Sequence, residues 1–288
     1  MNVFLASVGF GLITSAVLAI AAVGFTLQFA VTDVLNLAFA AVMTTGAFTA
    51  YLVNRAGYSV WLGLVAAMLA GALLSVTLNY VVYAPFQRRG SAPITLVIVS
   101  LGMALIIEFG IAAVAGGVGV SYQMSQGSTF KAGGLVLTTV QVVIMAVSVI
   151  VMAAVAVLLR YSRLGKAMRA TAANRMLARC CGVRADRVIG ITWVLTGALS
   201  GLAGTVFAID VGTFDYTSTD IFLVLILAAV FLGGPGSAYG AMLGALVIGL
   251  STEVSAAYIA ADYKYVIAFV LLLVMLALRP AGLLGRTT

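Results

Sequence analysis

Few residues in this chain could do chemistry, and none of them stands in a catalytic pattern. The sequence has no histidine, which removes histidine-ligated metal sites and nucleophiles paired with a histidine base. The two cysteines, Cys180 and Cys181, are neighbours, and adjacent positions argue against a structural disulfide. Gly165-Lys166 matches the end of a phosphate-binding loop, but the upstream glycine and the following Ser or Thr are missing. We therefore expect no catalytic residue, no metal and no cofactor in this chain, and we expect that it is not an enzyme.

Glu108 is an acidic residue in unusual surroundings, because long apolar runs flank it on both sides. A carboxylate inside a bilayer costs several kcal/mol unless it is paired, hydrated or neutral, which makes Glu108 a candidate for a transport pathway. The alternative is a hydrogen bond to a neighbouring helix with no further role, and the sequence does not separate the two. In either case we expect Glu108 to face protein or water rather than lipid.

A second candidate, Asn36, lies in a polar break at residues 32–37 (TDVLNL), directly after the first apolar run. A charge and an amide at this point indicate either a re-entrant or interfacial element, or a short cytoplasmic turn. The residues taken alone favour the turn.

One segment, residues 160–187, accounts for the whole net charge of the chain. The segment contains a single acid, Asp186, and its net charge equals the +7 of the whole chain. A basic loop between long apolar runs lies on the cytoplasmic side of a membrane. Its basic residues are Arg160, Arg163, Lys166, Arg169, Arg175, Arg179, Arg184 and Arg187.

The same segment carries apolar side chains at every fourth position. This spacing predicts a short amphipathic helix with one slanting apolar stripe, and Gly182 stands where a left-handed C-cap is expected. Such a helix could lie on anionic headgroups or seat in a groove of a cytoplasmic protein, and composition does not separate these readings. The stripe consists of Leu164, Met168, Ala172, Met176 and Cys180.

The elements that would position these residues must be membrane helices. The chain is 64% hydrophobic and only 8% charged, whereas a soluble domain has about 25% charged residues. We predict an all-α polytopic membrane protein with about eight to nine transmembrane or re-entrant helices, in one domain over residues 1–288. The basic excess belongs to one loop, so we expect no nucleic-acid partner. The apolar runs are 5–30, 37–54, 60–83, 93–113, 137–159, 188–208, 221–234, 237–257 and 264–279.

Lysine and arginine positions predict the orientation of the chain. If the 160–187 loop is cytoplasmic, twelve of the fifteen basic residues lie inside, and only Arg55, Lys131 and Lys264 lie outside. This bias supports an external N-terminus and a cytoplasmic C-terminus.

The run 221–234 is too short for an ordinary span. Its 14 residues would reach about 21 Å as a helix, less than a hydrocarbon core of about 30 Å. Gly233, Gly234, Pro235 and Gly236 follow at its end and break a helix. We predict a re-entrant or broken-helix element buried in protein.

Small residues also recur at a spacing of four, at Gly197 and Gly201 and again at Gly236, Gly240 and Gly244. This spacing lets helix backbones approach closely. Packing within the chain is favoured over a subunit interface.

Two longer motifs resemble the signatures of the branched-chain amino acid ABC-importer permeases. One is GKAMRATA at 165–172, followed by CGVRADRVI at 181–189; the other is LGGPGS at 232–237. The chain departs from the family after the first apolar run, where residues 36–40 (NLAFA) lack the His and Gly that the family often shows.

The resemblance implies a permease subunit of an ABC importer in a bacterial or archaeal inner membrane. Its partners would be two cytoplasmic ATP-binding subunits, a second permease subunit (a similar chain or itself), an external solute-binding protein and the bilayer. The solute would be a branched-chain or related amino acid, although family members also serve urea, short amides and aromatic acids, and related importers serve sugars. An ATP-independent channel or facilitator, or a scaffold subunit without a pathway, are the alternatives.

Two sets of residues would then carry the function. The 160–187 loop would couple ATP hydrolysis to transport through Leu164, Lys166, Met168, Arg169, Ala172, Arg175 and Met176. The substrate pathway would include Asn36, Glu108, Gly233, Gly234 and Gly236.

Overall fold

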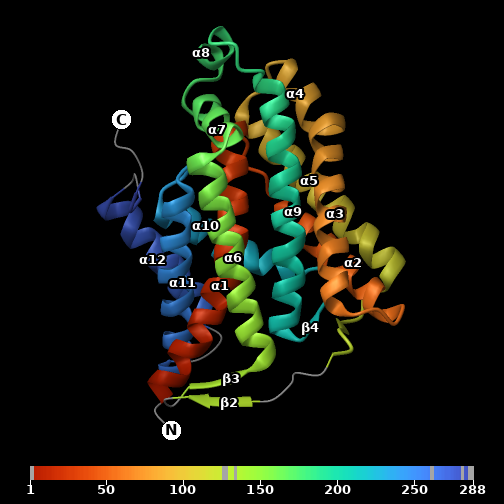
Figure 1. Cartoon of the computed structure of the whole chain (residues 1–288), viewed down its shortest axis with the longest axis vertical. Coiled ribbons are helices and arrows are strands. Elements are labelled where there is room, and N and C mark those ends of the chain that lie inside the picture. The colour runs from red at the N-terminus through yellow and green to blue at the C-terminus, as the bar shows by residue number, and fades with distance from the viewer. Residues whose placement is uncertain (1–2, 125–128, 133–134, 260–262, 280–281, 285–288) are drawn as a thin grey trace. The chain divides into compact units, whose positions relative to one another are not determined.

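The computed structural model describes residues 3–124, 129–132, 135–259, 263–279 and 282–284. Within these ranges the chain is almost wholly helical, with two short antiparallel strand pairs (Figure 1). This confirms the prediction of an all-α polytopic membrane protein. The predicted eight to nine spans are not confirmed, because six described helices are long and apolar enough to cross a bilayer. They are Phe4–Thr32, Val60–Arg88, Pro93–Ala115, Thr139–Tyr161, Ala185–Val211 and Ala238–Tyr258.

Each of the nine apolar runs forms a helix. These are α1 (Val3–Thr32), α2 (Phe39–Arg55), α3 (Val60–Leu78), α5 (Pro93–Ala115), α6 (Thr139–Tyr161), α9 (Ala185–Val211), α10 (Ser218–Gly233), α11 (Ala238–Tyr258) and α12 (Lys264–Leu278). Shorter elements are the π-helical turn η1 (Asn79–Tyr83), α4 (Ala84–Arg88), α7 (Arg163–Ala173) and α8 (Arg175–Cys180). Strand β1 (Val120–Ser121) pairs with β4 (Thr213–Phe214), and β2 (Thr129–Ala132) pairs with β3 (Leu135–Thr138).

The chain divides into two compact units that interleave along the sequence. The first unit consists of Met1–Thr26, Met124–Ala154 and Val224–Thr288, and the second of Leu27–Gln123 and Val155–Leu223. The boundaries fall within α1, α6 and α10. The expectation of one domain over the whole chain stays a prediction.

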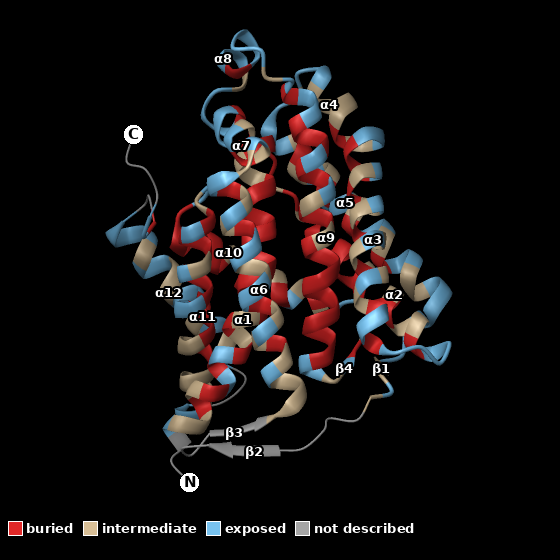
Figure 2. Cartoon of the chain, viewed as in Figure 1, coloured by how far each residue is buried: buried red, intermediate tan, exposed pale blue. Residues whose placement is uncertain are grey.

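Helix α9 is the centre of the second unit and packs against α2 and α3. Figure 2 shows α9 buried over most of its length, whereas α3 exposes much of its surface. A Cβ added at Gly201 would lie 2.1 Å from the carbonyl oxygen of Ala67, and one at Gly197 would lie 2.4 Å from that of Gly71. Only glycine permits these approaches, so the small-residue spacing serves packing within the chain, as predicted.

In the first unit, α10 ends at Gly233 and α11 begins at Ala238, which confirms a broken helix at this point. Gly234 and Gly236 adopt φ angles of 106° and 87°, a region that favours glycine. The break is only partly buried, because Pro235 and Gly236 are exposed, so that part of the prediction is wrong. The last described residues contact the end of α10 just before the break. The backbone N–H groups of residues 283 and 284 donate hydrogen bonds to the carbonyl oxygens of residues 232 and 233.

Candidate functional site

The basic segment folds as two helices rather than the single amphipathic helix that the sequence predicted. Helix α7 ends at Ala173, and Asn174 adopts an extended conformation (φ −161°, ψ 106°). The Asn174 side chain accepts a hydrogen bond from the backbone N–H of Leu177 at 2.9 Å and thereby caps α8. An asparagine that bonds to the backbone in this way ends one helix and starts another. The predicted apolar stripe from residue 164 to residue 180 is therefore divided between two helices and does not lie on one face.

Helix α7 is fixed to the end of α6. The hydroxyl of Ser162 accepts a hydrogen bond from the N–H of Gly165 at 2.8 Å and caps α7. A Cβ added at Gly165 would lie 2.3 Å from the carbonyl oxygen of Leu158, so the two backbones are in contact. The guanidinium group of Arg169 donates a hydrogen bond to the carbonyl oxygen of Leu159. These contacts hold the start of α7 against the end of α6.

Exposure separates the predicted coupling residues into two groups. The prediction placed Met168 on an outer docking surface, but its side chain is only 1% exposed and is buried. Met176 and Leu177 are 78% and 61% exposed, and Ala172 is exposed as well. Leu177 was missed because it lies outside the four-residue spacing, although it follows Met176 directly in the sequence.

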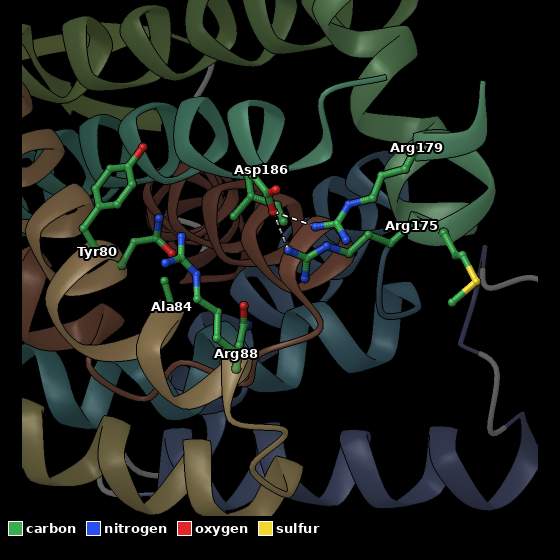
Figure 3. Close-up of a pocket in the computed structure, with 10 residues that line it drawn as sticks. Tyr80, Ala84, Arg88, Arg175, Arg179 and Asp186 are labelled. Carbon is green, nitrogen blue, oxygen red and sulfur yellow. Dashed lines mark hydrogen bonds and ion pairs between the residues drawn. The ribbon is translucent and has the colours of Figure 1, made fainter. Parts of the chain in front are cut away.

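Other members of the predicted coupling set differ in exposure and in their partners. Lys166 is exposed, and Leu164 is half-buried. Arg175, by contrast, donates to an Asp186 carboxylate oxygen at 2.9 Å, and Arg179 donates to the same oxygen at 2.8 Å (Figure 3). Arg175 and Met176 both line a pocket of the second unit, and the predicted coupling role of Arg175 stays a prediction.

Asn36 lies in a buried link between α1 and α2. It is 2% exposed, and its side-chain oxygen accepts a hydrogen bond from the Tyr83 hydroxyl at 2.6 Å. The Tyr83 ring stacks on Trp193 with the centroids 4.9 Å apart. The backbone N–H of Leu37 donates to the hydroxyl of Ser100, within α5, at 3.1 Å. The link is short, as expected for a turn, but Asn36 in it is buried, and the geometry fits irregular backbone that protein groups satisfy. Its predicted cytoplasmic position stays a prediction.

Glu108 faces the interior of the second unit, as predicted. It is 3% exposed, and its carboxyl group lies near that of Asp220, in the first turn of α10. One Glu108 oxygen, Oε1, has no hydrogen-bond partner among the described residues. The ring of the next residue, Phe109, lies 5.9 Å from that of Tyr216.

More polar groups surround the start of α10. The hydroxyls of Thr44 and Thr219 are hydrogen-bonded to each other, and Thr219 donates to the carbonyl oxygen of Ala40 at 3.1 Å. Burial raises the pKa of Asp215, but hydrogen bonds from Ser218 and Thr217 outweigh it and hold this pKa below its usual range. Sequence reasoning missed this cluster because its members come from distant segments, and no local spacing connects them.

Gly233, Gly234 and Gly236 belong to the first unit, and backbone fills the space beside two of them. A Cβ at Gly233 would lie 2.1 Å from the carbonyl oxygen of Gly240, and Gly282 packs against Gly234. Their predicted place in the pathway stays a prediction.

The first unit also contains an ion pair that sequence reasoning did not find. Lys264 donates to Glu253 Oε1 at 2.6 Å, and the hydroxyl of Thr14 donates to the same oxygen at 3.0 Å. The pair connects α11 with the start of α12. Among the described residues, no group of three or more His, Cys, Asp or Glu side chains could hold a metal ion.

Comparisons with known proteins agree with the motifs. A family model described as "Branched-chain amino acid transport system / permease component" matches residues 7–276. The chain is 29% identical to the high-affinity branched-chain amino acid transport system permease protein LivH of Escherichia coli K12, over 96% of this chain and 94% of the relative. It is 28% identical to the corresponding protein BraD of Pseudomonas aeruginosa, with the same coverage.

One solved structure, described as PsaBC from Streptococcus pneumoniae in complex with Fab, has a similar fold. Its TM-score is 0.52 at 15% identity, and the match covers 93% of this chain and 90% of that chain. At this identity the likeness concerns the fold alone. The family model, in contrast, covers nearly the whole sequence, and the chain therefore belongs to the permease component family of branched-chain amino acid transport systems.

Proposed function

We propose that this permease component forms one transmembrane half of an importer for branched-chain or related amino acids. Cytoplasmic ATP-binding subunits would drive it through α7 and α8. The observation that carries the proposal is the exposed pair Met176 and Leu177 on α8, which contacts α7 and α9. The names of the relatives support the solute class.

The coupling surface consists of Ala172, Met176 and Leu177, with the exposed Lys166 on the same pair of helices. It lies in the polar segment between two long apolar helices, outside the apolar windows that lipid chains would cover. A coupling element must be firmly attached to the helices that it moves. The Ser162 cap and the close backbone contact at Gly165 supply that attachment on the α6 side.

The pathway in this proposal runs beside the polar groups within the second unit. Glu108 and Asp220 offer two neighbouring carboxyl groups, and Asn36 offers an amide in irregular backbone. A buried acid without a cation partner is costly in a membrane, so a functional reason for keeping it is the default inference. We assign Glu108 to the pathway on this ground.

The remaining parts of the proposal follow from the charge distribution and the family. The N-terminus is external, and the C-terminus and the 160–187 segment are cytoplasmic, because twelve of fifteen basic residues then lie inside. Two ATP-binding subunits, a second permease subunit and an external solute-binding protein complete the assembly. ATP is hydrolysed by the partner subunits, and this chain contributes no catalytic group.

Reconstitution of the complete transporter in proteoliposomes tests the proposal. We expect uptake of radiolabelled leucine with ATP and the solute-binding protein, and none with a non-hydrolysable analogue. Uptake without ATP would identify a facilitator and refute the proposal. If leucine is not taken up but urea, an amide, an aromatic acid or a sugar is, the solute class is wrong while the coupling stands.

A further inference from the structure

A pocket of about 430 Å³ lies within the second unit, where the ends of two apolar helices meet the polar segment. Its walls come from η1 and α4 on one side and from α8 and the first turns of α9 on the other. Figure 3 shows Arg88 on the α4 side and Arg175 and Arg179 on the α8 side, with Asp186 hydrogen-bonded to the latter two. Pro85 follows the π turn, and its missing N–H is one cause of a change in helix register at this point.

The charges of the pocket do not balance. Three guanidinium groups line it, and Asp186 is the one carboxylate among its described lining residues. Asp186 is shared by Arg175 and Arg179, while no described ion pair engages Arg88. In addition, Nε of Arg175 is buried and has no hydrogen-bond partner in the described part of the chain. A net positive pocket with an unused N–H donor fits an anion with several acceptor oxygens.

The position of the pocket indicates whether that anion is a lipid headgroup or a free anion. Arg88 is the last residue of the apolar stretch that begins at Val60, so the pocket lies at the boundary between hydrocarbon and water. Leu69 and Leu73 on α3 are 67% and 71% exposed, and Tyr80, seven residues after Leu73, is 60% exposed. Residues at these spacings share one helix face. An apolar track on α3 therefore leads directly to the pocket.

We propose that this pocket binds the phosphate of an anionic phospholipid whose acyl chains lie along the exposed face of α3. Basic pockets at the cytoplasmic ends of membrane helices recognise such headgroups, and the adjoining apolar track favours a lipid over free phosphate. Arg175 and Arg179 belong to α8, the helix that carries Met176 and Leu177. A bound lipid therefore holds α8 in place and makes coupling sensitive to the anionic lipid content of the membrane.

Native mass spectrometry of the full-length chain, released from detergent with defined lipids, tests the site. We expect phosphatidylglycerol to stay bound and phosphatidylcholine to be lost. Arg88→Gln should weaken retention of phosphatidylglycerol about fivefold, the effect of one arginine near an anionic headgroup. Arg89→Gln is the matched control, because it removes the same charge from the next residue, which does not line the pocket. Arg179→Gln and its control Arg184→Gln repeat the comparison on the opposite wall.

The possible results separate the sources of the anion. Equal loss of phosphatidylglycerol in Arg88→Gln and Arg89→Gln, or unchanged binding in both pocket variants, would overturn the proposal. Equal retention of phosphatidylcholine would also overturn it, because the site would then not select for charge. Displacement of the lipid by millimolar inorganic phosphate would mean that the pocket is a free-anion site. Leucine uptake by the reconstituted transporter is measured separately, so a failed lipid site leaves the proposed transport function standing.

Discussion

Replacing Met176 with alanine tests whether α8 makes the contact with an ATP-binding subunit. Met176 is 78% exposed in the chain alone. Burial of a whole methionine side chain contributes about 1.5–3 kcal/mol, and that range scaled by the exposed fraction gives about 1.2–2.3 kcal/mol. The corresponding loss is a roughly 7- to 50-fold weaker complex. Leu177→Ala should act in the same direction, with a somewhat smaller effect because Leu177 is less exposed.

Met168→Ala is the matched control for the loss of a methionine. Met168 is 1% exposed, so its truncation leaves a cavity and costs about 2–5 kcal/mol of folding stability. It removes nothing from the outer surface. We therefore expect a lower Tm for Met168→Ala but an unchanged affinity for the ATP-binding subunit in the fraction that remains folded.

The assay is a titration of the purified ATP-binding subunit onto the permease in nanodiscs, read out as Kd, with the Tm of each variant measured in parallel. Substrate-stimulated ATP hydrolysis provides a second readout. If Met176→Ala binds as tightly as the wild type, the coupling surface does not include α8. A folded Met168→Ala permease with weakened binding would show that docking depends on buried parts of α7, which contradicts the argument from exposure.

Three further substitutions test other parts of the structure. Glu108→Gln should slow leucine uptake at unchanged expression, because it removes the ionisable group that Glu108 contributes to the pathway; wild-type uptake would remove Glu108 from the pathway. Gly201→Val should lower the Tm because a Cβ there meets backbone at 2.1 Å, whereas Gly102→Val, with open space around its Cβ, should not. Lys264→Met should lower the Tm, because it leaves the half-buried Glu253 carboxylate without its cation and with only the Thr14 hydroxyl bonded to the same oxygen among the described residues. The added change Glu253→Gln should restore most of that loss, and the Tm of the single and double variants measures it.

Most of the fold could be predicted from the sequence because membrane helices are specified by local composition. Every apolar run forms a helix, and the glycines from 233 to 236 mark a real helix break. The number of spans is harder to predict, because length alone does not separate a 16-residue helix such as α10 from a transmembrane one. Apolar composition says that a segment avoids water, but it does not say whether lipid or protein surrounds it.

The site was predicted less well, and the reasons lie in particular residues. One asparagine, Asn174, interrupts a regular four-residue spacing and changes which side chains are exposed. Asn36 is buried because Tyr83, 47 residues away, supplies its hydrogen bond. Glu108 meets Asp220 across an even longer separation. Periodicity detects neighbours along one helix, and these contacts connect different helices, so only the folded chain reveals them.

Because α8 is short, the exposure of its side chains depends on the residues that line the adjoining pocket. A helix of six residues has little stability of its own, so its orientation depends on contacts with the rest of the unit. Those contacts are the Asn174 cap, the buried side chain of Ala178 and the paired bonds of Arg175 and Arg179 to Asp186. Asp186 is 74% exposed at its side chain, and an exposed ion pair contributes little because water and salt screen it. The outward presentation of Met176 and Leu177 therefore rests on weak interactions, and an anion that engages the same arginines would strengthen it.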